Sequence, residues 1–282
     1  MPDPLLKKIA IGTVQFGLDY GISNQAGITE INEAAKILAF AKEFGIDLID
    51  TAYAYGRSEE VLGEVGIEGF RVVSKFLPDS NGLSMHEQVK TTLKRLRMEH
   101  LYGLLAHRPL GVMERPDSWK QLMELKHKGV VDKIGFSFNT PEEADQLLDK
   151  GYEPDLIQVP FNYLDKRFVN IMAQLKAKGC EIHTRSAFLQ GLFFMSTEEL
   201  PAFFDEVKPF LSNIQRQGSA LPGLLLKYCT NQSSIDKVVI GINNKQQLEQ
   251  NLNSLSTEEI LEEHHLSIRS EILTPSEWPK IK

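Results

Sequence analysis

Short apolar runs alternate along the chain with longer segments in which apolar residues recur at helical spacing. The apolar runs end at turn residues and lack the strict apolar–polar alternation of a half-exposed strand. Such runs are typical of strands that are buried on both faces of a parallel sheet. The predicted strands are Lys8–Gly12, Ile46–Thr51, Arg71–Phe76, Leu101–His107, Lys133–Ser137, Leu156–Pro160, Cys180–Arg185 and Lys237–Gly241.

The segments between the predicted strands carry signals for helix ends. Ser84 and Glu87 have the spacing of a capping box, and Thr140 and Glu143 repeat it. In a capping box the first side chain accepts a hydrogen bond from the backbone three residues on, and the second side chain returns one. A glycine follows four of the helical patterns, where a left-handed residue ends a helix well. These glycines are Gly45, Gly129, Gly151 and Gly179.

Eight successive strand–helix units predict an α/β fold, a single (β/α)8 TIM barrel over residues 1–282. The alternative is a doubly wound sheet, which needs a glycine-rich turn between its first strand and a helix; Gly12–Gly17 is not followed by a helical pattern. Residues 187–212 are expected to be a loop and helical insertion after strand seven that forms a lid or pocket wall, or packs on the barrel rim. Residues 257–265 predict a charged helix within a short C-terminal helical tail.

Composition narrows the range of partners. The net charge of −7 disfavours nucleic acid, and a hydrophobic content of 42% is ordinary for a soluble protein.

Cys180 and Cys229 lie in apolar surroundings without metal or redox spacing, as is typical of reduced cysteines. No run approaches the ~20 apolar residues of a membrane span. We therefore expect a cytoplasmic protein, a monomer or weak homo-oligomer, that binds neither nucleic acid nor a membrane.

Ionisable residues stand at the ends of three consecutive predicted strands. Asp50, Lys75 and His107 end strands two, three and four, and Tyr55 lies in the loop after Asp50. In a barrel the carboxyl ends of the strands meet at one face, with neighbouring strands ~4.8 Å apart, so these side chains can converge. A phenol with a pKa of about 10 is a poor acid, but a nearby ammonium stabilises the phenolate. With a histidine donating to the same oxygen, such a set could protonate a carbonyl oxygen while hydride reaches its carbon.

These residues and a series of short motifs, taken in order, resemble the aldo-keto reductase superfamily. The resemblance implies that Tyr55 is the general acid, that Lys75 and Asp50 tune it, and that His107 orients the carbonyl. It also implies a nicotinamide dinucleotide bound in extended form without a Rossmann domain, and no metal. The motifs are Gly12-Thr13, Asp50-Thr51-Ala52, Tyr55-Gly56, Ser58-Glu59, Leu62-Gly63, Ser74-Lys75, Leu105-Ala106-His107-Arg108-Pro109, Ile134-Gly135-Phe136-Ser137, Ile157-Gln158 and Asn251-Leu252.

The same resemblance implies a cofactor site and NADP(H) rather than NAD(H). The chain departs from the family pattern after strand eight, where many members have basic residues that grip the 2′-phosphate of NADPH. Gly241 and Gln247 fall at those positions, and Lys245 is the cation left nearby, so weaker discrimination between the dinucleotides is expected. The residues that the resemblance assigns to the cofactor are Gly12, Thr13, Ser137, Gln158, Arg185, Ser186, Gly241, Asn244, Lys245, Gln247 and Asn251.

The leading hypothesis is reduction of an aldehyde or ketone by NAD(P)H. The segment Gly12–Gly21 is similar to family members from bacterial polysaccharide pathways, which suggests a sugar or sugar derivative as substrate. One alternative is a cofactor-binding regulatory subunit without turnover. Another is a metal-dependent barrel hydrolase that uses Asp50, His107 and His183, although strand one lacks the His-x-His pattern common in such barrels.

Overall fold

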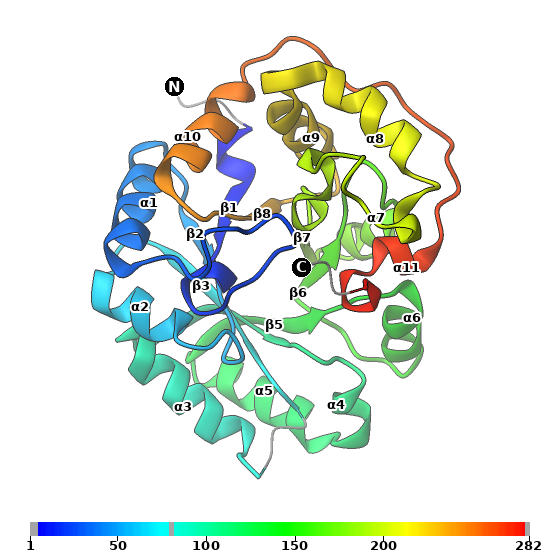
Figure 1. Ribbon diagram of the computed structural model, residues 1–282. Helices are drawn as coiled ribbons and strands as arrows, with labels where there is room; N and C mark the ends of the chain where they lie inside the picture. Colours follow the sequence, from blue (N-terminus) through cyan, green and yellow to red (C-terminus); the bar gives the residue numbers. More distant parts are fainter. Residues whose placement is uncertain (1–4, 79–81, 280–282) are drawn as a thin grey trace.

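The computed structural model describes residues 5–78 and 82–279. Within these residues eight parallel strands close into a barrel in sequence order, and helices form a ring around it (Figure 1). The predicted (β/α)8 fold is therefore confirmed. The strands are β1 Ile9–Gly12, β2 Leu48–Asp50, β3 Arg71–Phe76, β4 Leu101–Ala106, β5 Val131–Ser137, β6 Leu156–Pro160, β7 Glu181–Arg185 and β8 Lys237–Gly241.

The observed strands differ from the predicted ones only at their ends. β2 begins at Leu48 rather than at Ile46, because the Ile46 backbone N–H donates to the Ala41 carbonyl and closes the preceding helix. β5 begins earlier, at Val131, because this residue pairs with Leu101 at the start of β4. The end of the preceding helix thus decides where β2 begins, and pairing with the neighbouring strand decides where β5 begins.

The helices connect the strands on the outside of the barrel. In the described part of the chain, none combines the length and the apolar character that crossing a membrane requires. The α-helices are α1 Ile31–Glu43, α2 Ser58–Val65, α3 Met85–Leu96, α4 Gly111–Glu114, α5 Asp117–His127, α6 Pro141–Asp149, α7 Val169–Ala177, α8 Lys208–Ile214, α9 Leu221–Thr230, α10 Lys245–Ser254 and α11 Ser270–Leu273. The 3-10 helices are η1 Leu6–Lys8, η2 Val14–Phe16, η3 Leu189–Phe194, η4 Ala202–Phe204, η5 Gln215–Ala220 and η6 Pro275–Glu277.

The predicted helix-end signals are confirmed. Ser84 and Glu87 make both hydrogen bonds of a capping box at the start of α3, and Thr140 and Glu143 make both at the start of α6. Positive φ angles, which glycine adopts without steric cost, are found at each glycine that was expected to end a helix. These are Gly45, Gly129, Gly151 and Gly179.

The main hydrophobic core lies between the barrel and its helices. A second cluster, which we call the rim cluster, covers one side of the barrel mouth. It joins Phe193 and Phe204, which follow β7, to Ile272 and Leu273 near the C-terminal end. Each buried Ile, Leu or Phe contributes roughly 1.5–3 kcal/mol, so the rim cluster docks two segments that are distant in sequence. A third, smaller cluster of aliphatic side chains fills the inside of the barrel: Ala10, Leu48, Val73, Leu105, Leu156 and Val239.

Residues 187–212, where a loop and helical insertion was expected, contain η3 and η4 and the first turn of α8. Phe193 in η3 and Phe204 in η4 are buried in the rim cluster.

The C-terminal tail differs from its prediction. Residues 257–269 form no helix, so the charged helix expected over 257–265 is wrong. The chain instead passes around α9 and α8 and ends in the short α11 at the barrel mouth (Figure 1). Contacts with the barrel hold it there, because His264 Nε2 lies 2.6 Å from the Tyr163 carbonyl oxygen.

Candidate active site

Neighbouring strands bring the predicted ionisable side chains to the same end of the barrel. Asp50 is the last residue of β2, Lys75 is next to last in β3, and His107 directly follows β4. Tyr55 lies in the loop between β2 and α2. In barrels of this kind, the carboxyl ends of the strands form the face that carries the site.

Lys75 and Asp50 form a buried ion pair. The Lys75 Nζ lies 2.6 Å from Asp50 Oδ1, with the two side chains 0% and 4% exposed, and it also donates to the Thr51 carbonyl at 3.0 Å. Gln158 Nε2 donates to the other carboxylate oxygen, Oδ2, at 2.7 Å. Burial disfavours the ammonium, but attraction to Asp50 and to Tyr55 outweighs it, so the pKa of Lys75 is raised above its ordinary value. The lysine is therefore charged at neutral pH.

Tyr55 and His107 complete the group. The Lys75 Nζ lies 5.1 Å from the centre of the Tyr55 ring. The rings of Tyr55 and His107 meet edge to face, with centroids 5.6 Å apart and planes inclined at 81°. The structure thus brings together all four residues of the predicted catalytic group.

His107 is held in its neutral form. Burial, together with repulsion from Lys75, Arg185 and Arg108, lowers the pKa of His107 to about 3. Its Nδ1 is buried and has no hydrogen-bond partner among the residues that the structure describes. A neutral imidazole has one N–H donor, and it adds no second positive charge beside Lys75.

Two glycines and a serine hold the loop that carries Tyr55. A Cβ on Gly17 would lie 1.9 Å from the Tyr55 carbonyl oxygen, so only glycine lets these segments touch. Gly56 has a φ of 55°, which favours glycine, and it packs against Gly17. Ser58 Oγ donates to the Thr13 carbonyl at 2.8 Å and ties the start of α2 to the residue that follows β1. The motif residues around Tyr55 therefore fix its position.

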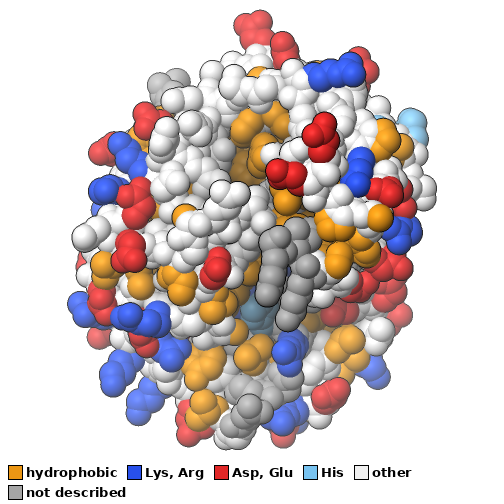
Figure 2. Space-filling view, in the orientation of Figure 1, with side chains coloured by type: hydrophobic (Ala, Val, Ile, Leu, Met, Phe, Trp, Pro, Cys, Tyr) orange, Lys and Arg blue, Asp and Glu red, His pale blue; other side chains and the backbone are white. Residues whose placement is uncertain are grey.

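A cavity of about 780 Å³ opens at this end of the barrel, within the range of known ligand pockets. Tyr55 and His107 line it, and so do Gly241 and Gln247 at the end of β8 and on α10. Figure 2 shows this face hollowed near its centre, with hydrophobic side chains around the hollow and most charged ones at the periphery. The cavity therefore connects the catalytic group with the part of the site that the resemblance assigns to the cofactor.

Most of the residues assigned to a cofactor face this cavity. Three do not line it: Asn244, Lys245 and Asn251. Arg185 is held in the cavity wall by Asn139, whose Oδ1 accepts from Nη2 at 2.6 Å. Those that line the cavity are Gly12, Thr13, Ser137, Gln158, Arg185, Ser186, Gly241 and Gln247.

Several buried polar atoms lack a hydrogen-bond partner among the described residues. Gln158 Oε1 is one, and because Nε2 of the same side chain is engaged by Asp50, Oε1 is an acceptor for an amide such as the nicotinamide carboxamide. Gln15 Oε1 and Asn251 Nδ2 are two others. Buried polar groups are normally paired, so the orphan atoms of Gln158 and Gln15, which both line the cavity, fit a site that a polar ligand completes. The residues present are thus compatible with a dinucleotide.

The start of α10 is occupied by a carboxylate. Glu33 Oε1 on α1 accepts from the Lys245 backbone N–H at 2.8 Å. That N–H, together with the Lys36 ammonium, lowers the pKa of Glu33 below its ordinary value, so the carboxylate is ionised at neutral pH. The Lys245 ammonium lies 4.8 Å from the centre of the Phe40 ring. The helix start that could offer amides to a phosphate therefore already holds an anion.

Sequence reasoning missed three features of the site. Gln15 is 8% exposed and packs so closely on Gly241 that a Cβ there would lie 2.6 Å from its Nε2. Tyr20 reaches across the mouth, where its hydroxyl accepts from Gln190 Nε2 at 2.8 Å. Residues 273–276 of the tail line the cavity. Only Gln15 carried a local signal, because it lies within the glycine-flanked turn after β1.

The residues considered for a metal do not come together. His183 pairs with Lys237 at the start of β8, away from the barrel mouth, and its Nε2 lies 2.7 Å from Glu181 Oε1. Across residues 5–78 and 82–279, no group of three or more His, Cys, Asp or Glu side chains has the arrangement of a metal site.

Several known proteins are similar to this chain in sequence or in fold. A sequence model of the aldo/keto reductase family matches residues 8–271. An aldo-keto reductase of Mycobacterium tuberculosis is 29% identical over 132 residues, which make up 44% of this chain and 47% of the relative. The methylglyoxal reductase DkgA of Escherichia coli is 27% identical over 175 residues, or 58% of this chain and 60% of that protein. The chain thus spans about half the length of the first relatives that it matches.

The fold comparison agrees. A crystal structure from Pseudomonas aeruginosa that is named for the same family is 26% identical, covers 88% of each chain and superposes with a TM-score of 0.66. Because the family match runs through all eight strands and includes Asp50, Tyr55, Lys75 and His107, the chain belongs to the aldo-keto reductase family.

Proposed function

We propose that this protein reduces an aldehyde or ketone to an alcohol with NAD(P)H, and that Tyr55 is the general acid. The observation that carries the proposal is the meeting of Tyr55 and His107 at the wall of one cavity, with Lys75 buried beside the Tyr55 ring and kept charged by Asp50. A phenol next to a fixed ammonium and a neutral imidazole suits proton transfer to a carbonyl oxygen.

Each residue has a distinct role in this proposal. The Tyr55 hydroxyl gives its proton to the carbonyl oxygen as the C=O bond is reduced. The Lys75 ammonium stabilises the phenolate that Tyr55 becomes, and Asp50 holds that ammonium in place. The neutral His107 donates an N–H to the same oxygen and orients it. The dinucleotide, when bound, supplies the hydride that the carbonyl carbon receives.

The cavity walls offer groups for a dinucleotide. Ser137 and Gln158 would hold the carboxamide, since the Gln158 Oε1 acceptor is otherwise unpaired among the described residues. Arg185 and Ser186 would hold the phosphates by charge and hydrogen bonding. We further propose that Asn251, with its unpaired Nδ2, contacts the adenine.

The two dinucleotides differ at the 2′ position of the adenosine ribose. The family resemblance favours NADP(H), but the Glu33 carboxylate at the start of α10 would repel a 2′-phosphate. The Lys245 side chain is directed to Phe40 and does not line the cavity. We propose that both dinucleotides bind and that NADPH has little advantage over NADH.

The substrate proposal is a small carbonyl compound such as a sugar or sugar derivative. The relative named a methylglyoxal reductase favours a small carbonyl compound, and the Gly12–Gly21 segment favours a sugar. Both substrate classes are compatible with this cavity, because its lining contains polar groups and also apolar side chains such as Phe188 and Phe194.

A direct test uses the purified protein with NADH and NADPH. Dinucleotide binding is followed by fluorescence, and turnover is followed by dinucleotide absorbance on a panel of short aldehydes, methylglyoxal, aldoses and keto sugars. The proposal expects binding and turnover of at least one carbonyl class. Binding with no turnover across the panel would support a regulatory subunit instead, and absence of dinucleotide binding would refute both.

A further inference from the structure

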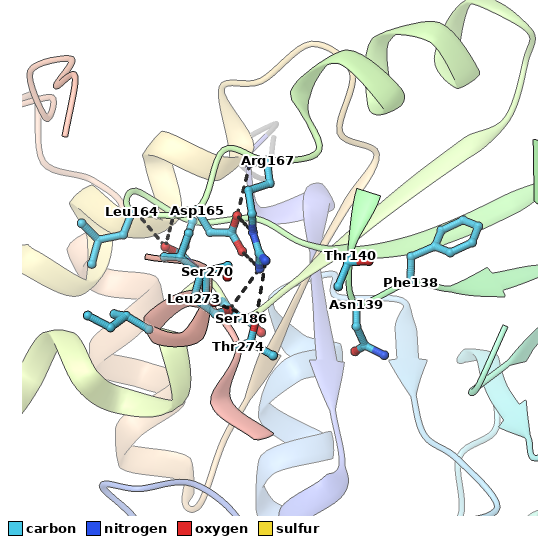
Figure 3. A network of polar contacts seen from close by, with 12 residues as sticks. Phe138, Asn139, Thr140, Leu164, Asp165, Arg167, Ser186, Ser270, Leu273 and Thr274 are labelled. Atoms are coloured by element: carbon cyan, nitrogen blue, oxygen red, sulfur yellow. Dashed lines mark hydrogen bonds and ion pairs between the residues drawn. The ribbon is translucent and has the colours of Figure 1, made fainter. Parts of the chain in front are cut away.

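One arginine anchors the C-terminal tail to the loop between β6 and α7. Arg167 binds Asp165 in a two-point contact, Nε to Oδ1 at 2.9 Å and Nη2 to Oδ2 at 2.8 Å. The same guanidinium donates from Nη2 to the Leu273 carbonyl at 3.2 Å and from Nη1 to Thr274 Oγ1 at 3.5 Å (Figure 3). Arginine suits this bridge because its planar fork has five donors, whereas a lysine ammonium is a single point charge.

The loop on which Arg167 stands is itself rigid. Asp165 is wholly buried, so its charge needs the guanidinium beside it. Asn162 Oδ1 accepts from the backbone N–H groups of Leu164 and Asp165 and shapes the turn. Asn162 Nδ2 donates to the Ser186 carbonyl at 3.0 Å and fastens the turn to the residues after β7.

Both ends of this chain of contacts reach the cavity. Ser186 lines the cavity after β7, and the tail lines it through residues 273–276, which we call the tail wall. Hydrogen bonds run from Ser186 through Asn162 and the turn to Asp165, Arg167 and the tail wall. Two walls of the cavity that are distant in sequence are thus joined by Arg167.

We infer that Arg167 is a positioning residue that sets how far the tail wall stands from the wall after β7, and so selects carbonyl substrates by size. This inference rests on the proposed carbonyl reduction. Arg167 itself does not line the cavity, and it acts through Leu273 and Thr274.

The tail has a second attachment that does not depend on Arg167. Ile272 and Leu273 are buried in the rim cluster. Trp278 Nε1 donates to the Ile272 carbonyl at 2.9 Å, and the Trp278 ring lies 5.2 Å from that of Phe204. Weakening the Arg167 contacts should therefore leave the tail docked while letting the tail wall shift. The effect should fall on substrate fit and not on proton transfer at Tyr55.

The test compares Arg167→Lys with Lys166→Gln. Lys166 is the adjacent residue and also holds the tail, through an ion pair of 2.7 Å with Glu263, but neither residue lines the cavity. Thr274→Val is a milder second variant, which removes the hydroxyl and keeps the side chain's shape. For each protein, kcat and KM are measured with propanal and with naphthaldehyde, and hydrogen exchange is measured in peptides covering residues 270–278.

For Arg167→Lys we expect the KM ratio, the KM for propanal divided by the KM for naphthaldehyde, to rise about fivefold or more. We expect kcat and the dinucleotide Kd to stay within about twofold, and exchange in the tail wall to quicken. Thr274→Val should shift the KM ratio in the same direction by a smaller factor, and Lys166→Gln should leave it unchanged. The inference is overturned if both KM values stay unchanged or move in proportion, or if Lys166→Gln shifts the ratio equally.

Failure of the proposed function is distinguishable from failure of this inference. If the wild-type protein reduces neither compound, the carbonyl reduction fails, and the exchange measurement still decides whether Arg167 positions the tail wall. If the wild-type protein is active and Arg167→Lys and Thr274→Val match it in KM ratio and exchange, only the inference fails. If Arg167→Lys does not fold, Thr274→Val decides alone.

Discussion

The Lys75 ammonium and the Asp50 carboxylate lie 2.6 Å apart on neighbouring strands, almost completely shielded from water. A buried charge without a partner is costly, whereas a paired one is tolerated. The pair keeps a fixed positive charge beside Tyr55. Gln158 donates a hydrogen bond to Asp50, which connects the pair to the part of the cavity proposed for the nicotinamide. The proposed catalysis and the stability of the barrel mouth therefore depend on the same contact.

Replacing Lys75 by methionine should abolish most turnover and also destabilise the protein. The phenolate loses its electrostatic support, so we expect kcat to fall by roughly a hundredfold or more. Asp50 is left buried without a cation, at a cost of about 3–5 kcal/mol in the free energy of unfolding. The measurements are steady-state kinetics and urea unfolding.

The double variant Asp50→Asn/Lys75→Met separates the two effects. Removing both charges should restore much of the stability but not the activity. If Lys75→Met alone keeps near-native kcat, the lysine is structural and its proposed role fails.

His107 should stay neutral throughout the physiological range. Its pKa of about 3 lies below that of the unfolded chain, about 6.5. As pH falls below about 6.5 the unfolded chain takes up a proton that the folded protein refuses, so His107 lowers the stability progressively until about pH 3. NMR of the imidazole signal, assigned with a His107→Gln variant, should show no titration between about pH 5 and pH 8. A midpoint inside that range would contradict the account.

Glu33→Gln should improve the binding of NADPH relative to NADH. The change removes the negative charge at the start of α10 and leaves the amide geometry of the helix nearly unaltered. We expect the ratio of the two Kd values to move toward NADPH by about threefold to tenfold, and less at high salt. Fluorescence titration measures both constants without turnover.

The matched control is Glu43→Gln, which removes the same charge from the exposed far end of α1. It should leave the ratio unchanged. Equal ratios in Glu33→Gln and the wild-type protein would mean that Glu33 does not face the 2′ position.

Glu181 should stabilise the opposite end of the barrel in a pH-dependent way. Burial raises its pKa, but His183, Lys133 and Tyr102 outweigh burial and hold the pKa of Glu181 well below its usual range. A depressed pKa contributes stability that is present above the unfolded value of about 4.3 and is lost as pH falls toward the folded value. Glu181→Gln should therefore cost about 3 kcal/mol at neutral pH, and the difference from the wild-type protein should shrink below about pH 4.

Urea unfolding across pH measures this difference. The control is Glu124→Gln, which removes an exposed pair with Lys128 at 3.9 Å and should cost roughly 0.5 kcal/mol or less. A Glu181→Gln effect as small as the control, or one that grows as pH falls, would show that the Glu181 contacts do not stabilise the fold.

The fold and the catalytic group could be predicted because their signals are local. A strand buried on both faces is a continuous apolar run, and the residue at its end, such as Asp50 or Lys75, is marked by its position in the chain. The sequence also marks the loop that carries Tyr55, because Gly56 directly follows this tyrosine and Ser58 begins the next helix.

The course of the C-terminal tail and the contacts at the start of α10, near the proposed adenosine position, could not be predicted. The contacts that form them join residues that are distant in sequence. Glu33 and Lys245 are 212 positions apart, and Arg167 and Leu273 are 106 apart. The segment after α10 has the charge pattern of a helix, yet it forms none, and its His264 contacts the carbonyl oxygen of the distant Tyr163. Such pairings follow from how the completed barrel places its loops, so no single stretch of sequence carries them.

The central claim is that Tyr55 delivers the proton to a bound carbonyl oxygen, and Tyr55→Phe tests it most directly. Tyr53→Phe is the matched control, because Tyr53 lies in the same loop but its ring faces Arg95 at 5.0 Å. With a carbonyl substrate and NAD(P)H, kcat of Tyr55→Phe should fall by roughly a hundredfold to ten-thousandfold while the dinucleotide Kd hardly changes. Tyr53→Phe should keep the wild-type rate. Near-native turnover in Tyr55→Phe, or an equal loss in Tyr53→Phe, would contradict the account.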